Sequence, residues 1–280
     1  LFALQVSRPG LWLTSVWFYC LPVAGMDVLG SVRFWLGAFF VTFPMGFMVY
    51  GWNDAVDFET DRANPRKGSL LFGARGTREQ LATLPWRIVL VELPFLGIFL
   101  WLIGPKVLWI GVAGVAVSGL YNVFLKGRPP FEIFNQAGYV LVLVFSSWLN
   151  DAPMVPWQTF AFGAAFAMHA HVFGEILDID PDRAAGRRTT AAVIGAVKAK
   201  WLVAAMLAAE ASFVWFYFAD WLFTAFLGAS AVWFVLDATA LWKDRPYSLR
   251  QMTGFMLLWN VVAVVLLVYV WSTGSLSQIR

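Results

Sequence analysis

Two acidic clusters that share one spacing are the part of the sequence best able to do chemistry. Each has carboxylates at positions i, i+3 and i+7, and the two sets are Asp54, Asp57 and Asp61, and Glu175, Asp178 and Asp182. On a helix, this spacing places three carboxylates on one face. Because like charges placed together repel each other, we expect a cationic partner. A hard divalent ion that prefers oxygen ligands fits best.

Basic residues follow both acidic clusters. They are Arg62, Arg66 and Lys67 after the first, and Arg183, Arg187 and Arg188 after the second. Carboxylates that hold a metal, with cations close by, indicate a site for a metal-bridged diphosphate. Arg187 and Arg188 also fit the role of positively charged anchors at a membrane surface, and we favour that role for them. Glu59 and Asp180 lie off the acidic faces, so we expect them to face solvent or to support the metal ligands from outside.

The composition is that of an integral membrane protein. Of the 280 residues, 60% are hydrophobic and 13% are charged, whereas a soluble domain has about 25% charged residues. The apolar blocks have the length of helices, which excludes an outer-membrane barrel. Cys20 is the single cysteine, which excludes an intrachain disulfide, and no Cys/His cluster indicates zinc. No basic module indicates nucleic-acid binding.

Nine apolar segments predict nine transmembrane helices around a central cavity, at 11–29, 33–52, 88–104, 106–124, 134–149, 157–176, 200–219, 221–241 and 252–272. The loops between them are alternately basic and nearly uncharged. Of the 20 Lys and Arg, only three fall on the uncharged side: Arg33, Lys106 and Arg280. The positive-inside rule therefore predicts a cytoplasmic N-terminus. The sequence begins with Leu1, so we expect the natural N-terminus upstream, and we interpret the first segment as a membrane span rather than a signal peptide.

Both acidic clusters are expected at the cytoplasmic ends of spans with one orientation, 33–52 and 157–176. These spans are four helices apart, which predicts a parallel internal repeat of spans 1–4 and 5–8 within a single domain, 1–280. The loop from Asn64 to about Trp86 is the longest. It fits either a mobile lid over the site or a polar connection.

With these residues the sequence resembles the UbiA superfamily of intramembrane prenyltransferases. The similar stretches are Asn53-Asp54-x-x-Asp57-x-x-x-Asp61, Asp178-x-x-x-Asp182, the basic element from Tyr121 to Lys126 and Arg128, and Arg8-Pro9 before the first helix. Nine helices with cytoplasmic motifs are the family architecture. Residues 64–68 and 185–190 most resemble the carotenoid branch, the lycopene elongases.

The resemblance implies that an allylic diphosphate ionises and that an electron-rich carbon captures the carbocation. It implies a magnesium site formed by Asn53, Asp54, Asp57, Asp61, Glu175, Asp178 and Asp182. It implies diphosphate binding by Asn53, Arg66, Lys67, Tyr121, Lys126 and Arg128. The catalytic set would be Asp54, Asp57, Asp61, Lys126, Asp178 and Asp182. The partners would be a prenyl diphosphate, a lipid-soluble acceptor and membrane lipids, with the active site on the cytoplasmic side of a prokaryotic cell membrane.

Several alternatives remain open from the sequence. The acceptor is expected to be a carotenoid such as lycopene, but a quinone or aromatic acceptor also fits, as does a terpene cyclase that needs no acceptor. A lipid-binding protein or transporter fits less well, because transporter sites lie at the bilayer midplane. Glu175 fits either a metal ligand or a hydrogen-bonding support. His169 and His171 lie two residues apart, so at most one faces inward, and a satisfied interhelical histidine is expected rather than a base.

Overall fold

Seven long apolar helices form most of the chain. The computed structural model describes residues 1–279, apart from the side chain of Ala63, so Arg280 lies outside the described residues. The seven are α3 (Val32–Val56), α6 (Leu84–Ile103), α7 (Val107–Leu120), α10 (Trp157–Leu177), α13 (Ala196–Phe218), α14 (Trp221–Thr239) and α15 (Leu249–Thr273). Each of the seven is long and apolar enough to cross a membrane, α7 together with the turn that follows it. No strand forms within residues 1–279, and the chain is therefore an all-α, multi-pass membrane protein.

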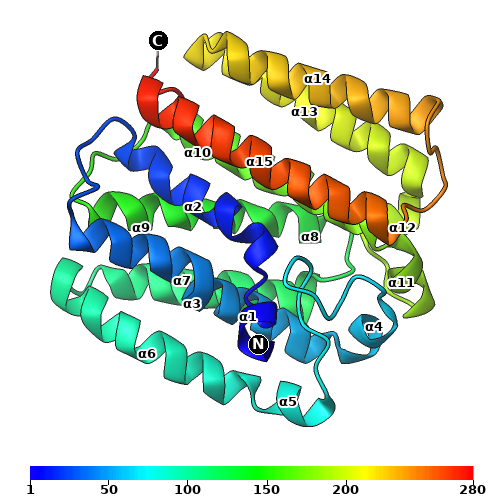
Figure 1. Cartoon of the computed structure of the whole chain (residues 1–280), viewed down its shortest axis with the longest axis horizontal. Coiled ribbons are helices and arrows are strands. Elements are labelled where there is room, and N and C mark those ends of the chain that lie inside the picture. Colours follow the sequence, from blue (N-terminus) through cyan, green and yellow to red (C-terminus); the bar gives the residue numbers. More distant parts are fainter. Residues whose placement is uncertain (280) are drawn as a thin grey trace.

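The helices lie side by side in a bundle that extends from α6 at one edge to α14 at the other (Figure 1). Large apolar side chains such as Trp101, Trp109 and Val268 are exposed on the outer helices α6, α7 and α15. Such exposure is expected where a helix faces lipid rather than water.

Two of the nine predicted spans are interrupted. Segment 11–29 forms η1 (Pro9–Leu11), α2 (Trp12–Cys20) and η2 (Leu21–Val23), while segment 134–149 follows α8 (Phe131–Phe134) and forms η4 (Asn135–Val140) and α9 (Leu141–Leu149). Pro22 lies within η2, where it removes a backbone donor. In η4, a Cβ on Gly138 would lie 2.4 Å from a Val117 side-chain atom, so η4 approaches α7 closely. The count of nine spans therefore stays a prediction.

The short helices α4 (Phe58–Ala63), α11 (Ile179–Ala184) and α12 (Thr190–Ile194) lie at one end of the bundle, at the right of Figure 1, and α5 (Arg78–Ala82) lies at its lower edge. The first helix, α1 (Phe2–Val6), packs against α3. The loop 64–77 folds back onto the N-terminal segment, where Gly10 donates its N–H to the carbonyl of Leu70 at 3.3 Å. A Cβ on Gly10 would lie 2.6 Å from the carbonyl oxygen of Leu71, so only glycine permits this approach.

Both acidic clusters lie on interrupted helices, which corrects the expectation of one continuous helical face. Helix α3 ends at Val56 and α4 begins at Phe58, so Asp57 stands between them with φ −96° and ψ 15°. Asp178 stands in the same way between α10 and α11, with φ −110° and ψ 8°. The break occurs at the central carboxylate of each cluster. It allows that carboxylate to turn toward partners that a straight helix would not offer.

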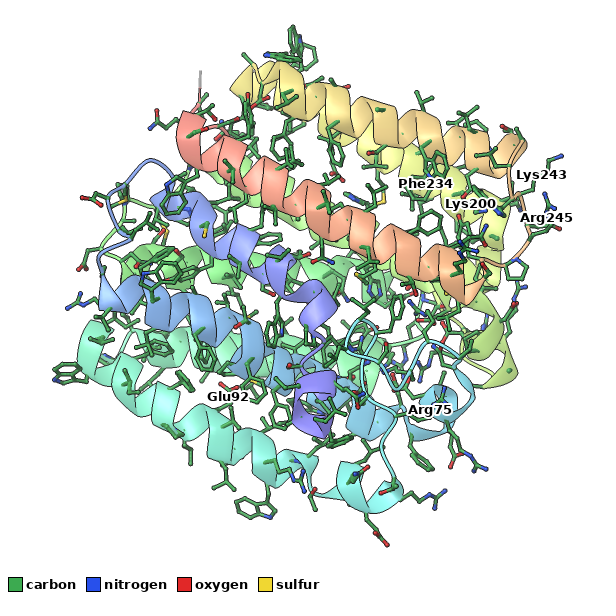
Figure 2. The ribbon with its side chains drawn as sticks, viewed as in Figure 1. Arg75, Glu92, Lys200, Phe234, Lys243 and Arg245 are labelled. Carbon is green, nitrogen blue, oxygen red and sulfur yellow. The ribbon has the colours of Figure 1, made fainter. Side chains whose placement is uncertain are left out.

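A second buried polar network closes the same end of the molecule, away from the acidic clusters. Lys200 on α13 is fully buried, and its Nζ lies 2.9 Å from Oδ1 of Asp237 on α14 and 2.8 Å from the carbonyl of Lys243. Tyr247 donates its hydroxyl to the other oxygen of Asp237. Lys200 and Lys243 lie together beside the loop from α14 to α15 (Figure 2). This network joins α13, α14 and that loop.

Candidate functional site

Asp54 is the most buried acid of the first cluster, with 1% of its surface exposed. Its Oδ1 lies 2.8 Å from Nη2 of Arg8 and 2.7 Å from Nζ of Lys67. The same Lys67 ammonium lies 2.6 Å from Oδ2 of Asp61. One lysine from the loop after α4 therefore bridges the first and third carboxylates of the cluster. Oδ2 of Asp54 is buried and has no hydrogen-bond partner.

Asp57, the central acid, is turned toward other parts of the chain. Oδ1 accepts a hydrogen bond of 2.6 Å from Nη2 of Arg187, and Oδ2 pairs with Lys126, which also donates to Asn53. Burial alone would raise the pKa of Asp57, but the charges of Lys126 and Arg187 hold it below its usual value. Burial, together with the nearby Arg187, lowers the pKa of Lys126 to about 8. The Lys126 ammonium is therefore the more easily neutralised partner.

A π-turn brings Lys126 to the first cluster. Residues Tyr121–Leu125 form this turn (η3) at the end of α7, and the N–H of Lys126 donates to the carbonyl of Tyr121 at 2.9 Å. The five-residue spacing keeps the two side chains on one side, with Nζ of Lys126 5.4 Å from the centre of the Tyr121 ring. π-turns are rare and occur often at functional sites. The sequence prediction that Tyr121 and Lys126 belong to one element agrees with this geometry.

The second cluster receives side chains from the loop that follows the first. Asp178 pairs with Arg66 and accepts a hydrogen bond of 2.7 Å from Nδ2 of Asn64. Asp182 accepts from the Thr189 hydroxyl at 3.0 Å. Burial, with the negative charge of Asp178, raises the pKa of Asp182 to about 7. In the first cluster, burial with the negative charges of Asp54 and Asp57 raises the pKa of Asp61 to about 6.

Arg187 joins the two clusters directly. Its Nη1 lies 3.6 Å from Oδ1 of Asp182, while its Nη2 holds Asp57. The sequence favours a membrane-anchor role for Arg187, but in the structure Arg187 pairs with carboxylates of both clusters instead. A usable signal existed, because Arg187 follows Asp182 by five residues just as Arg66 follows Asp61. Arg188, the neighbouring residue, is exposed, as an anchor would be.

Two more residues of the site were not singled out as ligands from the sequence. Arg8 stands before η1 in a left-handed conformation with φ 51°. Its guanidinium lies over the Tyr50 ring, 4.5 Å from the centroid, and reaches Asp54. Asn64, which directly follows α4, donates a hydrogen bond to Asp178. Both contacts depend on chain folding over long distances, which local spacing does not encode.

Glu175 has a different environment from the other five acids. Its Oε2 accepts a hydrogen bond of 3.0 Å from the N–H of Ala191, and Oε1 lies 3.2 Å from Nε2 of His171. Glu132 on α8 binds the start of the same helix, α12, because it accepts hydrogen bonds from the N–H and the hydroxyl of Thr190 at 2.8 and 2.7 Å. Of the two roles expected for Glu175, the structure favours hydrogen-bonding support.

The remaining predicted residues divide into two groups. Arg128 and Asp180 are exposed, and Glu59 pairs with Arg78 at the surface, which confirms the solvent-facing prediction for the two acids. His169 is buried, and its Nδ1 lies 2.7 Å from Oε1 of Glu210 on α13. The expectation of a satisfied interhelical histidine is therefore confirmed for His169.

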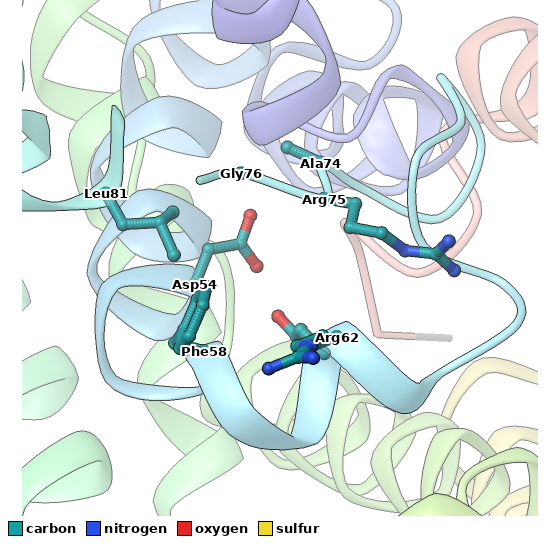
Figure 3. Close-up of a pocket in the computed structure, with 8 residues that line it drawn as sticks. Asp54, Phe58, Arg62, Ala74, Arg75, Gly76 and Leu81 are labelled. Atoms are coloured by element: carbon teal, nitrogen blue, oxygen red, sulfur yellow. The ribbon is translucent and has the colours of Figure 1, made fainter. Parts of the chain in front are cut away.

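A small hollow of about 10 Å³ lies beside the first cluster. Figure 3 shows Asp54 and Arg62 on one side of it and Ala74, Arg75 and Gly76 of the covering loop on the other. Among residues 1–279, no three His, Cys, Asp or Glu side chains are arranged to hold a metal in this state. The carboxylates instead hold the chain's own lysines and arginines.

Comparison with known proteins identifies relatives of this chain. Residues 11–261 match the UbiA prenyltransferase family. The chain is 27% identical over 262 residues to a lycopene elongase/hydratase of Corynebacterium glutamicum, covering 88% of this chain and 86% of the relative. It is 31% identical over 209 residues to a lycopene elongase/hydratase of Haloferax volcanii, covering 71% of this chain and 67% of the relative.

A solved structure has the same fold. It is that of a UbiA homologue from Archaeoglobus fulgidus bound to DMAPP and Mg²⁺, with a TM-score of 0.70 at 16% identity. The likeness covers 98% of this chain and 100% of that one. At this identity the comparison establishes the fold alone.

Proposed function

Since this chain belongs to the UbiA prenyltransferase family, we propose that it ionises an allylic prenyl diphosphate and transfers the prenyl group to a hydrophobic acceptor taken from the bilayer. The chain is a prenyltransferase, which replaces the lipid-binding and transport interpretations. One observation carries the proposal: two carboxylate clusters from distant parts of the chain share their cations at one end of the bundle. A diphosphate is an anion that can bind these cations in place of the carboxylates.

The donors present fit Mg²⁺ as the cofactor. They are carboxylate and amide oxygens, which Mg²⁺ prefers, and Oδ2 of Asp54 is buried without a hydrogen-bond partner. Lys67 lies between Asp54 and Asp61, and Arg187 lies between Asp57 and Asp182. Each of these cations therefore marks a place where two carboxylates converge on a positive charge. We assign the metal ligands to Asn53, Asp54, Asp57, Asp61, Asp178 and Asp182. When bound, Mg²⁺ neutralises the negative charge that develops on the departing diphosphate.

The cations now paired with carboxylates are the proposed diphosphate ligands. Arg66, Lys67, Lys126 and Arg187 each hold a carboxylate within ion-pair distance. Phosphate oxygens can replace carboxylate oxygens on these groups without leaving a buried charge unpaired. Tyr121, whose ring lies against Lys126, can donate its hydroxyl to the same anion. Asn53 and the exposed Arg128 complete the proposed set.

A carotenoid such as lycopene is the proposed acceptor. Both relatives compared above are named lycopene elongase/hydratase. The interior of the bundle supports an apolar acceptor, because Trp17 stacks on Phe166 at 5.9 Å and Phe18 meets Tyr139 at 6.4 Å. Aromatic faces can stabilise a carbocation and exclude water from it. A quinone or aromatic acceptor, and cyclisation without an acceptor, are the competing outcomes of the test below.

The finer architecture remains part of the proposal. We propose nine spans with a cytoplasmic N-terminus in a prokaryotic cell membrane, which puts the acidic clusters on the cytoplasmic side. We also propose that residues 1–280 form one domain with a parallel repeat. Support for the repeat comes from the equivalent breaks at Asp57 and Asp178 and from the exchange of Arg66 and Arg187 between the clusters.

The test uses purified protein in nanodiscs. Dimethylallyl and longer allylic diphosphates are supplied with Mg²⁺ or EDTA, and with lycopene, an aromatic acid, a quinone precursor or no acceptor. Mass spectrometry reads the products, and a coupled assay reads free diphosphate. We expect a metal-dependent prenyl–lycopene adduct. Prenylation of another acceptor would change the acceptor assignment, cyclised product without acceptor would indicate a cyclase, and no diphosphate release from folded protein would overturn the proposal.

A further inference from the structure

We propose that His171 is the base that takes up the final proton of the reaction, with Glu175 as its positioning residue. The inference rests on the proposed function, because capture of an allylic cation by an alkene leaves a new cation that must lose a proton or gain water. In the proposed complex the acidic clusters and their cations hold the metal and the diphosphate, so another group must take up that proton. The structure offers one at a suitable depth.

His171 lies on the same face of α10 as Glu175, the acid of the second cluster that belongs to this helix. It precedes Glu175 by four residues, an interval that brings side chains onto one face. Six residues of helix separate His171 from Leu177, where α10 ends before Asp178, and they correspond to about 9 Å along the axis. His171 therefore lies deeper in the bundle than Asp178 of the proposed metal site.

Of the two histidines, His171 is the one that borders the proposed site, because His169 faces Glu210 of α13 instead. The ring of His171 meets the Tyr121 ring edge-on, with 5.7 Å between the ring centres. Tyr121 also contacts Lys126, so His171 borders the group of residues proposed to hold the diphosphate. The side chain of His171 keeps 20% of its surface exposed. Nε2 of His171 and Oε1 of Glu175 are buried and have no hydrogen-bond partner among the residues that the structure describes.

Glu175 is placed to stabilise a positive charge on this imidazole. Its Oε1 lies 3.2 Å from Nε2 of His171, while its Oε2 is fixed by the N–H of Ala191 at 3.0 Å. The two facing atoms make no hydrogen bond in this state, so the carboxylate acts on the ring by its charge. The same carboxylate stabilises the imidazolium that forms. His169, two residues away, is instead paired with Glu210.

In the proposed step, the C–O bond of the allylic diphosphate breaks, and a C–C bond forms between its C1 and a terminal alkene carbon of the acceptor. The neighbouring acceptor carbon becomes the cation. It then loses a proton from an adjacent C–H, or bonds to water that loses a proton, and in either case the imidazole of His171 receives that proton. The imidazolium later returns it to the departing diphosphate or to water.

The test measures how each ionised substrate molecule is partitioned. Wild type, His171→Asn, His171→Ala and Glu175→Gln are compared for diphosphate released, adduct formed and free prenol formed. The prenol reports allylic cation captured by water. We expect the adduct-to-prenol ratio to fall about 100-fold in both His171 variants, within the usual range for a general base, and less in Glu175→Gln. Added imidazole is expected to restore part of the ratio in His171→Ala.

The matched control is His169→Asn on the same helix. It removes the buried partner of Glu210, so the yield of folded protein is expected to fall while the partition ratio stays at the wild-type value. Because the ratio is taken per ionisation, it does not depend on how much protein is active. An unchanged ratio in both His171 variants would overturn the role of His171 and would leave the prenyltransferase proposal intact. Absence of diphosphate release in wild type would overturn the prenyltransferase proposal instead.

Discussion

Nη2 of Arg187 lies 2.6 Å from Oδ1 of Asp57, across 130 residues of sequence. The relationship is reciprocal, since Arg66, which follows the first acidic cluster, pairs with Asp178 of the second. An arginine that follows each cluster therefore pairs with the central carboxylate of the other cluster. In this state the site neutralises itself, and a metal-bound diphosphate would replace these internal pairs with new ones.

We expect Arg187→Ala to lower the rate of diphosphate release by about 100-fold, the usual cost of losing one preorganised donor at a developing negative charge. Arg187→Lys should restore only part of the rate, because an ammonium lacks the bidentate geometry of a guanidinium. Arg188→Ala is the matched control, since Arg188 is the adjacent and exposed arginine. Equal effects of the two alanine variants would contradict a site role for Arg187.

Binding of Mg²⁺ is expected to strengthen as the pH rises from about 5.5 to 7.5. Burial raises the pKa of Asp61 to about 6 and that of Asp182 to about 7, each with help from neighbouring carboxylates. Below these values protons compete with the metal for the two carboxylates, and above them the carboxylates are free to bind it, so the apparent affinity should rise at least about tenfold. Calorimetry at several pH values measures this. A pH-independent affinity would remove these two acids from the ligand set.

Asp237→Ala is expected to destabilise the protein by about 3–5 kcal/mol, because it leaves the fully buried Lys200 without its partner. The double variant Lys200→Met with Asp237→Leu should recover most of this loss. Thermal unfolding in detergent measures both. Since the network lies outside the acidic clusters, the folded fraction of each variant should keep its turnover rate, and a specific loss of turnover would contradict a purely structural role.

The sequence was sufficient for the parts of the account that depend on local spacing. Seven long helices were predictable from apolar length, and the two carboxylate clusters from the repeated i, i+3, i+7 pattern. The breaks at Asp57 and Asp178 were not predictable, because the i, i+3, i+7 spacing that runs across each break is the spacing of a continuous helix. The interruption near Gly138 depends on contact with Val117 of another helix.

Partner choice was the least predictable feature of the site. Several arginines follow the two clusters, and local sequence does not show which of them reaches a carboxylate on another helix. Arg187 turns inward and Arg188 outward although they are adjacent. Arg8 reaches Asp54 only because the chain before η1 adopts a left-handed conformation. These contacts follow from tertiary packing, which overrides local preference.

Metal-dependent ionisation by both acidic clusters is the central claim, and diphosphate release from Asp54→Asn and Asp178→Asn tests it most directly. Asparagine keeps the shape of each side chain and removes its charge, and Glu59→Gln at the exposed Arg78 pair is the control. We predict that each cluster variant loses at least about 100-fold in rate with Mg²⁺ present, while it elutes as folded protein and the control stays at wild-type rate. Wild-type rates in both cluster variants would contradict the claim.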